Sequence, residues 1–253
     1  MDRNVWMKTR FTIGNLPQWI CPNCHKGWLE FDKTKFKRIE TASSKEWRKN
    51  EHSSFDEISY VFTGFLKCSN TRCKEVVVVS GIGEVTEVDI DSFGDSFIPE
   101  YFTPPLHLFK IPESCPQDIE SQIISAFRLF WIDEQSCANK IRIAIEAILN
   151  EQRVKKYEKI VGSNKEKSLS LHKRLEYFKS KQPKIADQLI ALKWIGNVGS
   201  HIGTIHRTNL IDAFEILEDS IEKLYDLKEK RLTALIKSIT KSKGVGYKMK
   251  NKT

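Results

Sequence analysis

Two pairs of cysteines constrain the fold of this chain more than any other feature of its sequence. Cys21 and Cys24 are separated by two residues, and Cys68 and Cys73 are separated by four. Each pair can form a short loop that supplies two sulfur ligands, and a strand-rich insert can bring the two loops together. This spacing predicts a Zn²⁺ ion held by four thiolates. Such a closed site is structural, because it leaves no open position for a substrate.

Two disulfides, or thiols that are merely buried, are the alternatives to metal. Disulfides need an oxidising compartment, and the first residues of the chain lack the apolar core of a signal peptide. No apolar run approaches the roughly 20 residues of a membrane span. We therefore expect a reduced, cytoplasmic protein without membrane contact, in which paired cysteines favour metal. His25 is a candidate substitute ligand or an ordinary exposed histidine, and Cys115 and Cys137, which have no partner spacing, are expected to be buried or half-buried.

The hydrophobic pattern changes from strand-like to helical near residues 112–116. Strand patterns cover residues 60–67 and 75–80, on either side of the second cysteine pair, and 84–90 follow a turn expected at Gly81 and Gly83. Prolines make 101–112 an extended connector. The N-terminal part is therefore expected to be rich in β structure.

Apolar residues recur at helical spacing after the connector. Ser114 and Gln117 form a capping-box pattern for a first helix, and Asp133 can cap a second. Residues 154–167 are expected to be a loop, Pro183 to begin a helix, and Asn209 to cap a long helix that continues to about residue 241. The predicted fold class is α+β: a β-rich zinc-ribbon domain at 1–110, an all-α bundle at 111–241 and a basic flexible tail at 242–253.

Positive charge is concentrated in two segments. The formal net charge is +8, and residues 153–184 contain eleven Lys or Arg against three acids. The tail from Lys237 onward has six lysines and no acid. These segments are either solvated surface or sites that contact the phosphates of a nucleic acid.

One stretch, residues 192–203, does not fit an ordinary helix. It contains three glycines within eight residues, each costing about 1 kcal/mol relative to alanine in a helix. Asn197 and His201 are four residues apart and would share a helical face. A histidine can transfer a proton near neutral pH, and an amide can orient a phosphate or a hydroxyl. The alternative is that both residues have local structural roles.

The two cysteine pairs and two helical motifs together resemble the bacterial domain of unknown function 4145. The motifs are Arg142-x-x-x-Glu146 and Ile-Gly-Asn197-x-x-x-His201. That family is similar to the HEPN superfamily of helical bundles, many of which are dimeric, metal-independent ribonucleases of toxin and antiviral systems. The resemblance implies a HEPN-like bundle, a homodimer, and RNA in preference to DNA, because only RNA has a 2′-hydroxyl.

The implied mechanism assigns His201 to proton transfer at the ribose 2′-hydroxyl or the 5′-oxygen, and Asn197 to holding the phosphate. The HEPN arginine is absent from its usual distance before His201; Lys193 is the nearest upstream basic residue and Arg142 is the other candidate, although Arg142 and Glu146 also have the spacing of a routine ion pair. Two functions stay open. One is an endoribonuclease of anti-phage defence, and the other is a non-catalytic nucleic-acid-binding or protein-interaction adaptor with restriction or defence partners.

Overall fold

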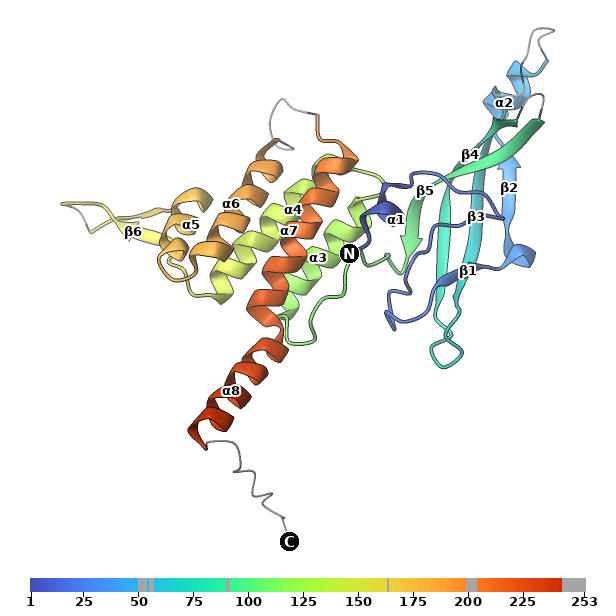
Figure 1. Cartoon of the computed structure of the whole chain (residues 1–253). Coiled ribbons are helices and arrows are strands. Elements are labelled where there is room, and N and C mark those ends of the chain that lie inside the picture. Colours follow the sequence, from blue (N-terminus) through green and yellow to red (C-terminus); the bar gives the residue numbers. More distant parts are fainter. Residues whose placement is uncertain (50–53, 55–56, 90–91, 163, 199–203, 243–253) are drawn as a thin grey trace.

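The N-terminal part of the chain forms an antiparallel sheet, and the C-terminal part forms a set of helices (Figure 1). The structure is a computed structural model that describes residues 1–49, 54, 57–89, 92–162, 164–198 and 204–242. It has the mixed α+β composition that the sequence predicts, with the strands of the main sheet first and the longer helices after them. Among the described helices, none combines the length and the apolar character needed to cross a membrane.

The sheet is built around β3. Its five strands are β1 (Leu29–Phe31), β2 (Lys37–Glu40), β3 (Ser59–Cys68), β4 (Val76–Asp89) and β5 (Ser92–Thr103). β1 and β2 both pair with β3, at opposite ends of that strand, and β4 pairs with β3 and β5. Short helical elements lie at α1 (Arg3–Met7), η1 (Lys33–Lys35) and α2 (Ala42–Trp47).

Alternation along β3 explains which face of the sheet packs. Phe62 and Leu66 are buried while Val61 and Lys67 are exposed, as expected where successive side chains point to opposite faces. The buried face packs against aromatic side chains, with Phe62 and Phe97 ring centroids 5.1 Å apart. Burial of these rings contributes hydrophobic stabilisation to this region.

The turn expected at Gly81 and Gly83 is wrong. β4 continues through both positions, and the pairing with β5 shifts register between Ser80 and Gly81. A Cβ atom at Gly81 would lie 2.1 Å from the carbonyl oxygen of Ile98. Glycine is therefore required by the close approach of β5 at this irregularity and not by a change of chain direction.

The described residues after the connector form six helices and one small hairpin (Figure 1). The helices are α3 (Gln117–Leu129), α4 (Glu134–Glu151), α5 (Leu171–Lys179), α6 (Pro183–Val198), α7 (Arg207–Tyr225) and α8 (Leu227–Lys241). The segment expected to be a loop instead contains the two-stranded hairpin of β6 (Tyr157–Lys159) and β7 (Glu166–Ser168). In Figure 1, α3, α4 and α7 run side by side, and α8 extends beyond them.

Several helix ends differ from their predicted chemistry. Asp133 caps α4 as predicted, its carboxylate accepting from the Ser136 N–H at 2.8 Å. Ser114, by contrast, donates to the Tyr225 carbonyl, so α3 begins at Gln117 without a side-chain cap. The predicted long last helix is two helices, because Asp226 is extended between α7 and α8.

The buried side chains of the sheet and the helices form one continuous core. Trp131, which follows α3, lies with its ring centroid 4.7 Å from that of Phe102 in β5 and 5.9 Å from that of Trp19. Aromatic contacts of this kind bury large apolar areas. They tie Trp131 to two side chains that both precede it in the chain, Trp19 by 112 positions and Phe102 by 29.

Candidate functional site

The two cysteine pairs meet at one edge of the sheet. Cys21 and Cys24 lie on the loop before β1, Cys68 ends β3, and Cys73 lies on the turn before β4. Tight turns hold both loops: the Gly27 carbonyl accepts from the Cys21 N–H at 2.8 Å. The pairing of Leu29 with Cys68 in the β1–β3 ladder then brings the first loop against the second. Pairing in the sheet therefore delivers the arrangement that the spacing predicted.

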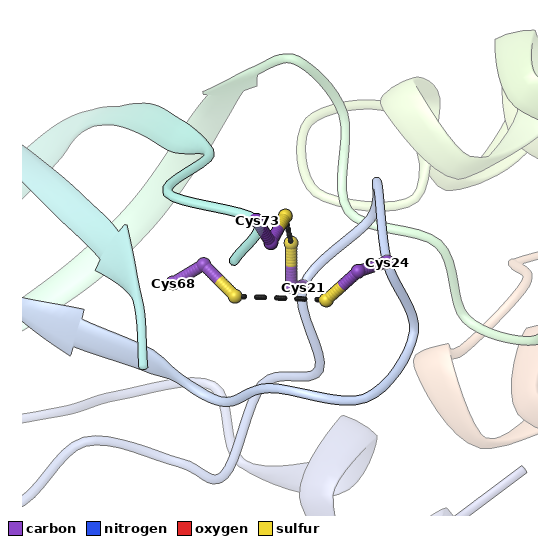
Figure 2. A group of neighbouring side chains, drawn as sticks. All are labelled: Cys21, Cys24, Cys68 and Cys73. Atoms are coloured by element: carbon purple, nitrogen blue, oxygen red, sulfur yellow. Dashed lines mark hydrogen bonds between the residues drawn. The ribbon is translucent and has the colours of Figure 1, made fainter. Parts of the chain in front are cut away.

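The four sulfurs have the separations of a metal tetrahedron. Cys24 Sγ lies 3.6 Å from Cys68 Sγ, Cys21 Sγ lies 3.8 Å from Cys73 Sγ, and all four lie within 4.8 Å of one another (Figure 2). Four sulfurs bound at about 2.3 Å from one Zn²⁺ would lie roughly 3.8 Å apart, whereas disulfide sulfurs are only about 2.05 Å apart. The arrangement is therefore that of four ligands which could bind a metal ion.

The surroundings of the sulfurs shift the pKa values of Cys24 and Cys68 in opposite directions. The backbone N–H of Gly27 lowers the pKa of Cys24 to about 6, while burial raises the pKa of Cys68 to about 12. Amide groups of Asn23 and Asn70 donate to Cys73 Sγ and Cys24 Sγ at 3.5 and 3.7 Å. A buried thiolate such as Cys68 needs a cation close by, which a central metal ion would provide.

His25, Cys115 and Cys137 lie outside this cluster. His25 is outside the metal-ligating group found among the described residues, and its ring faces that of His107 with centroids 5.2 Å apart. Cys115 and Cys137 are both buried, as the sequence predicts. Burial raises the pKa of Cys115 to about 12, so its thiol stays protonated at neutral pH.

The two helical motifs come together between α4 and α6. A Cβ atom placed at Gly196 would lie 3.0 Å from Arg142 Cβ and 3.2 Å from the Ala138 carbonyl oxygen. Glycine at this position lets α6 approach α4 more closely than a side chain would allow. The turn that carries Asn197 is therefore adjacent to the turn that carries Arg142.

The motif residues differ in their contacts and in how far they are buried. Arg142 Nη2 lies 3.8 Å from a carboxylate oxygen of Glu146, one turn further along α4, and its Nε is buried without a hydrogen-bond partner among the described residues. Lys193 is only 7% exposed, with its Nζ 3.6 Å from the ring centroid of Trp194. Asn197 is half-buried near the end of α6, and His201 lies outside the described residues.

The structure adds one buried cation that the sequence analysis missed. Arg174 is 6% exposed and lines a pocket together with Arg142, Glu146 and Asn150. The sequence does contain a signal: Arg174 stands within the apolar stripe of α5, beside Leu175 and one turn before Phe178. A charged residue on the buried face of a short helix needs compensation, and that requirement marks it as a candidate functional residue.

Comparison with known proteins gives two family matches. Residues 125–242 match a domain of unknown function, DUF4145, and residues 9–104 match another, DUF8608. The first match confirms the family resemblance seen in the helical motifs, and the second spans the four cysteines and all five strands of the main sheet. No curated protein and no solved structure shows significant similarity to the chain.

Proposed function

We propose that the chain is a HEPN-like nucleic-acid-acting protein of bacterial anti-phage defence or toxin type, with RNA as its substrate and endonucleolytic cleavage as its reaction. The observation that carries this proposal is the contact between the Arg142 turn of α4 and the Gly196 turn of α6. Two motifs more than fifty residues apart thereby contribute to one site, as a shared function requires.

The chain's own residues would divide the reaction between them. His201 would exchange a proton with the ribose 2′-hydroxyl or the leaving 5′-oxygen, and Asn197 would hold the phosphate. Arg142 is the better-placed cation to stabilise the charge on phosphorus, because Lys193 is directed to the ring of Trp194. Glu146 lies close enough to orient the Arg142 guanidinium.

Zinc would take no part in this chemistry. Cys21, Cys24, Cys68 and Cys73 would bind it as a complete set of four ligands, and the ion would hold the ribbon loops together. A reduced cysteine set of this kind suits the cytoplasm. A homodimer with two adjacent bundles, together with defence-system protein partners, completes the proposal.

Cleavage of RNA by the purified full-length chain tests the catalytic proposal. The assay contains EDTA to exclude adventitious magnesium, and the zinc content is measured in the same samples to show that the ribbon is intact. We expect wild-type protein to cleave RNA but not the same sequence as DNA, and His201→Ala to reduce the rate by at least about a hundredfold. Equal rates for wild type and His201→Ala, measured with native partner proteins present, would exclude this mechanism.

The exposed face of the sheet favours a second function, that of an adaptor. Ile39, Val61 and Ile82 lie opposite one another on β2, β3 and β4, with exposed fractions of 62, 51 and 44%. A row of exposed apolar side chains across a sheet is typical of an interaction surface. If the chain is an adaptor, Val61→Glu abolishes protection from phage in cells while His201→Ala leaves it unchanged; the reverse result supports the nuclease.

A further inference from the structure

A polar pocket opens between α4, the start of α5 and the base of the β6–β7 hairpin. Its volume is about 370 Å³. The charged side chains that line it are Arg142, Glu146, Lys156 and Arg174. We call this the Arg174 pocket. Three of these four carry positive charge and one carries negative charge, so the lining has a net excess of two positive charges.

Arg174 makes the pocket unusual, because its guanidinium is buried and incompletely compensated. Nη2 donates to Asn150 Oδ1 at 2.8 Å and to the Val154 carbonyl at 3.2 Å. These acceptors lie at the C-terminal end of α4, where the helix dipole favours a cation. However, Nε is buried without a partner, and no carboxylate among the described residues lies within 4 Å of the guanidinium. Burial lowers the pKa of Arg174. The negative charge of Glu146, which lies farther away, acts in the opposite direction and raises it.

The other groups that line the pocket add mostly positive charge and only one negative charge. Arg142 Nε is also buried and has no hydrogen-bond partner in the part of the chain that the structure describes, and Lys156 is exposed at the rim. The N-terminus of α5 begins at Leu171 in the pocket wall, and its first turn contains no acidic residue. A helix N-terminus carries partial positive charge from its free N–H groups. The carboxylate of Glu146 is the one acid in the lining, and its side chain is 44% exposed.

We propose that the Arg174 pocket binds a terminal phosphate group. A phosphate monoester is a dianion near neutral pH and would balance the excess of two positive charges in the lining. Its oxygens accept the planar, forked donors of arginine well. A terminal group is favoured over an internal phosphodiester because Arg174 is almost completely buried, so that only the end of a ligand reaches it.

Two sources present the same terminal phosphate: a free nucleotide, and the 5′ end of an RNA strand. Binding requires neither His201 nor cleavage, so the inference goes beyond the proposed function although Arg142 takes part in both. A protein that binds phosphate and never cleaves RNA would support this inference while contradicting the nuclease.

Calorimetric titration of the full-length chain in phosphate-free buffer tests the inference. The probes are inorganic phosphate, adenosine 5′-monophosphate, adenosine, and one short RNA with either a 5′-phosphate or a 5′-hydroxyl. We expect phosphate and the monophosphate to bind and adenosine not to bind. If RNA ends are the source, the 5′-phosphorylated strand binds about tenfold or more tightly than its 5′-hydroxyl form; if free nucleotides are the source, the two strands bind equally and the monophosphate binds more tightly than phosphate.

Matched charge variants of the hairpin separate this site from general electrostatic attraction. Lys156→Gln should weaken binding of the monophosphate about tenfold, whereas Lys159→Gln, an equal charge change at an exposed position outside the pocket lining, should leave it unchanged. Glu146→Gln should strengthen binding several-fold. Arg174→Met should abolish binding, with folding checked by thermal unfolding in the absence of ligand.

Three results would overturn the inference. Wild-type protein that binds neither phosphate nor the monophosphate at millimolar concentration has no such site. Equal losses in Lys156→Gln and Lys159→Gln would show attraction to the whole basic segment. Unchanged binding in a folded Arg174→Met protein would place the phosphate elsewhere.

Discussion

The sheet region, residues 1–103, and the helical region, residues 117–242, differ in whether their buried polar side chains have partners within the chain. In the sheet region the polar groups in question are a cluster of four sulfurs, two buried and two half-buried, whose separations match a tetrahedral set of metal ligands. In the helical region it is Arg174, a buried cation without a carboxylate partner among the described residues. The first arrangement is closed once a metal is bound, and the second stays open to an anion.

This difference separates structural from functional use of polar residues. A completed four-thiolate site has no vacant position, so it contributes to stability alone. A buried guanidinium with an unpartnered nitrogen is unfavourable by itself and is stabilised when a ligand binds. We therefore expect the sheet region to respond most strongly to changes that affect stability, and the helical region to respond through ligand binding.

Loss of one cysteine of the cluster should have the largest effect. If the cluster binds metal as proposed, Cys68→Ser should abolish metal binding, unfold the two cysteine loops and lower the free energy of unfolding by more than about 5 kcal/mol, because metal binding to such sites contributes directly to folding free energy. Zinc content by elemental analysis and near-ultraviolet circular dichroism measure the outcome. Cys115→Ala, a change at a buried cysteine outside the cluster, should keep full zinc content. Wild-type protein with the same melting temperature with and without metal would remove the distinction between the two regions.

Gly81→Ala should follow in size. A Cβ atom at this position would lie 2.1 Å from the Ile98 carbonyl oxygen, so β4 and β5 must move apart. We expect a loss of about 3 kcal/mol in urea unfolding. Gly14→Ala is the matched control, because no atom lies within 4 Å of its added Cβ, and it should change stability by less than about 0.5 kcal/mol. If Gly81→Ala and Gly14→Ala change the free energy of unfolding equally, β4 and β5 can move apart at Gly81 without loss of stability.

Gly196→Ala should have a smaller effect, in the helical region. Alanine gains about 1 kcal/mol of helix propensity over glycine, but its Cβ would lie 3.0 Å from Arg142 Cβ. We expect the helices to separate by a few tenths of an ångström and the net change in stability to stay within about 1 kcal/mol. RNA or phosphate binding should change more than stability does, and binding that is unaffected would show that the spacing of α4 and α6 is unimportant to either site. Ala191→Gly, on the exposed face of α6, isolates the propensity contribution.

Asp32 should produce the smallest effect, visible as a pH dependence. The Thr34 hydroxyl, followed by Lys67, lowers the pKa of this carboxyl from 3.8 to about 2. A carboxyl whose pKa is lower in the folded state stabilises the protein above its unfolded pKa, and that contribution is lost as pH falls from about 4 to about 2. Thermal unfolding of wild type and Asp32→Asn should therefore differ at pH 6, and most of that difference should be gone near pH 2. Acid also releases metal from thiolates, so the two proteins are compared in identical solutions; a difference at pH 2 as large as that at pH 6 would contradict the assignment.

Local patterns in the sequence were sufficient where the chemistry itself is local. Cys21 and Cys24, with two residues between them, lie on one short loop whatever the rest of the chain does. Period-two alternation located β3 and β4, and helical periodicity located most helices, whereas β1, β2 and β5 were not predicted. Expectations failed where a distant segment decides. Gly81 has the composition of a turn, but the approach of β5 makes it part of a strand. Ser114 has the spacing of a cap, but the Tyr225 carbonyl accepts its hydroxyl hydrogen bond.

The sequence by itself indicated the four cysteines that could bind a metal ion, the change from strands to helices and the family resemblance of the helical motifs, because each is signalled by short local patterns of residues. Only the tertiary structure placed Gly196 against Arg142 and buried Arg174 beside Asn150. Whether a charge is compensated depends on which groups are excluded from water around it, and those groups come from segments that meet only in the folded chain. The open, positively charged pocket therefore could not be read from the order of its residues, whereas the closed cysteine site could.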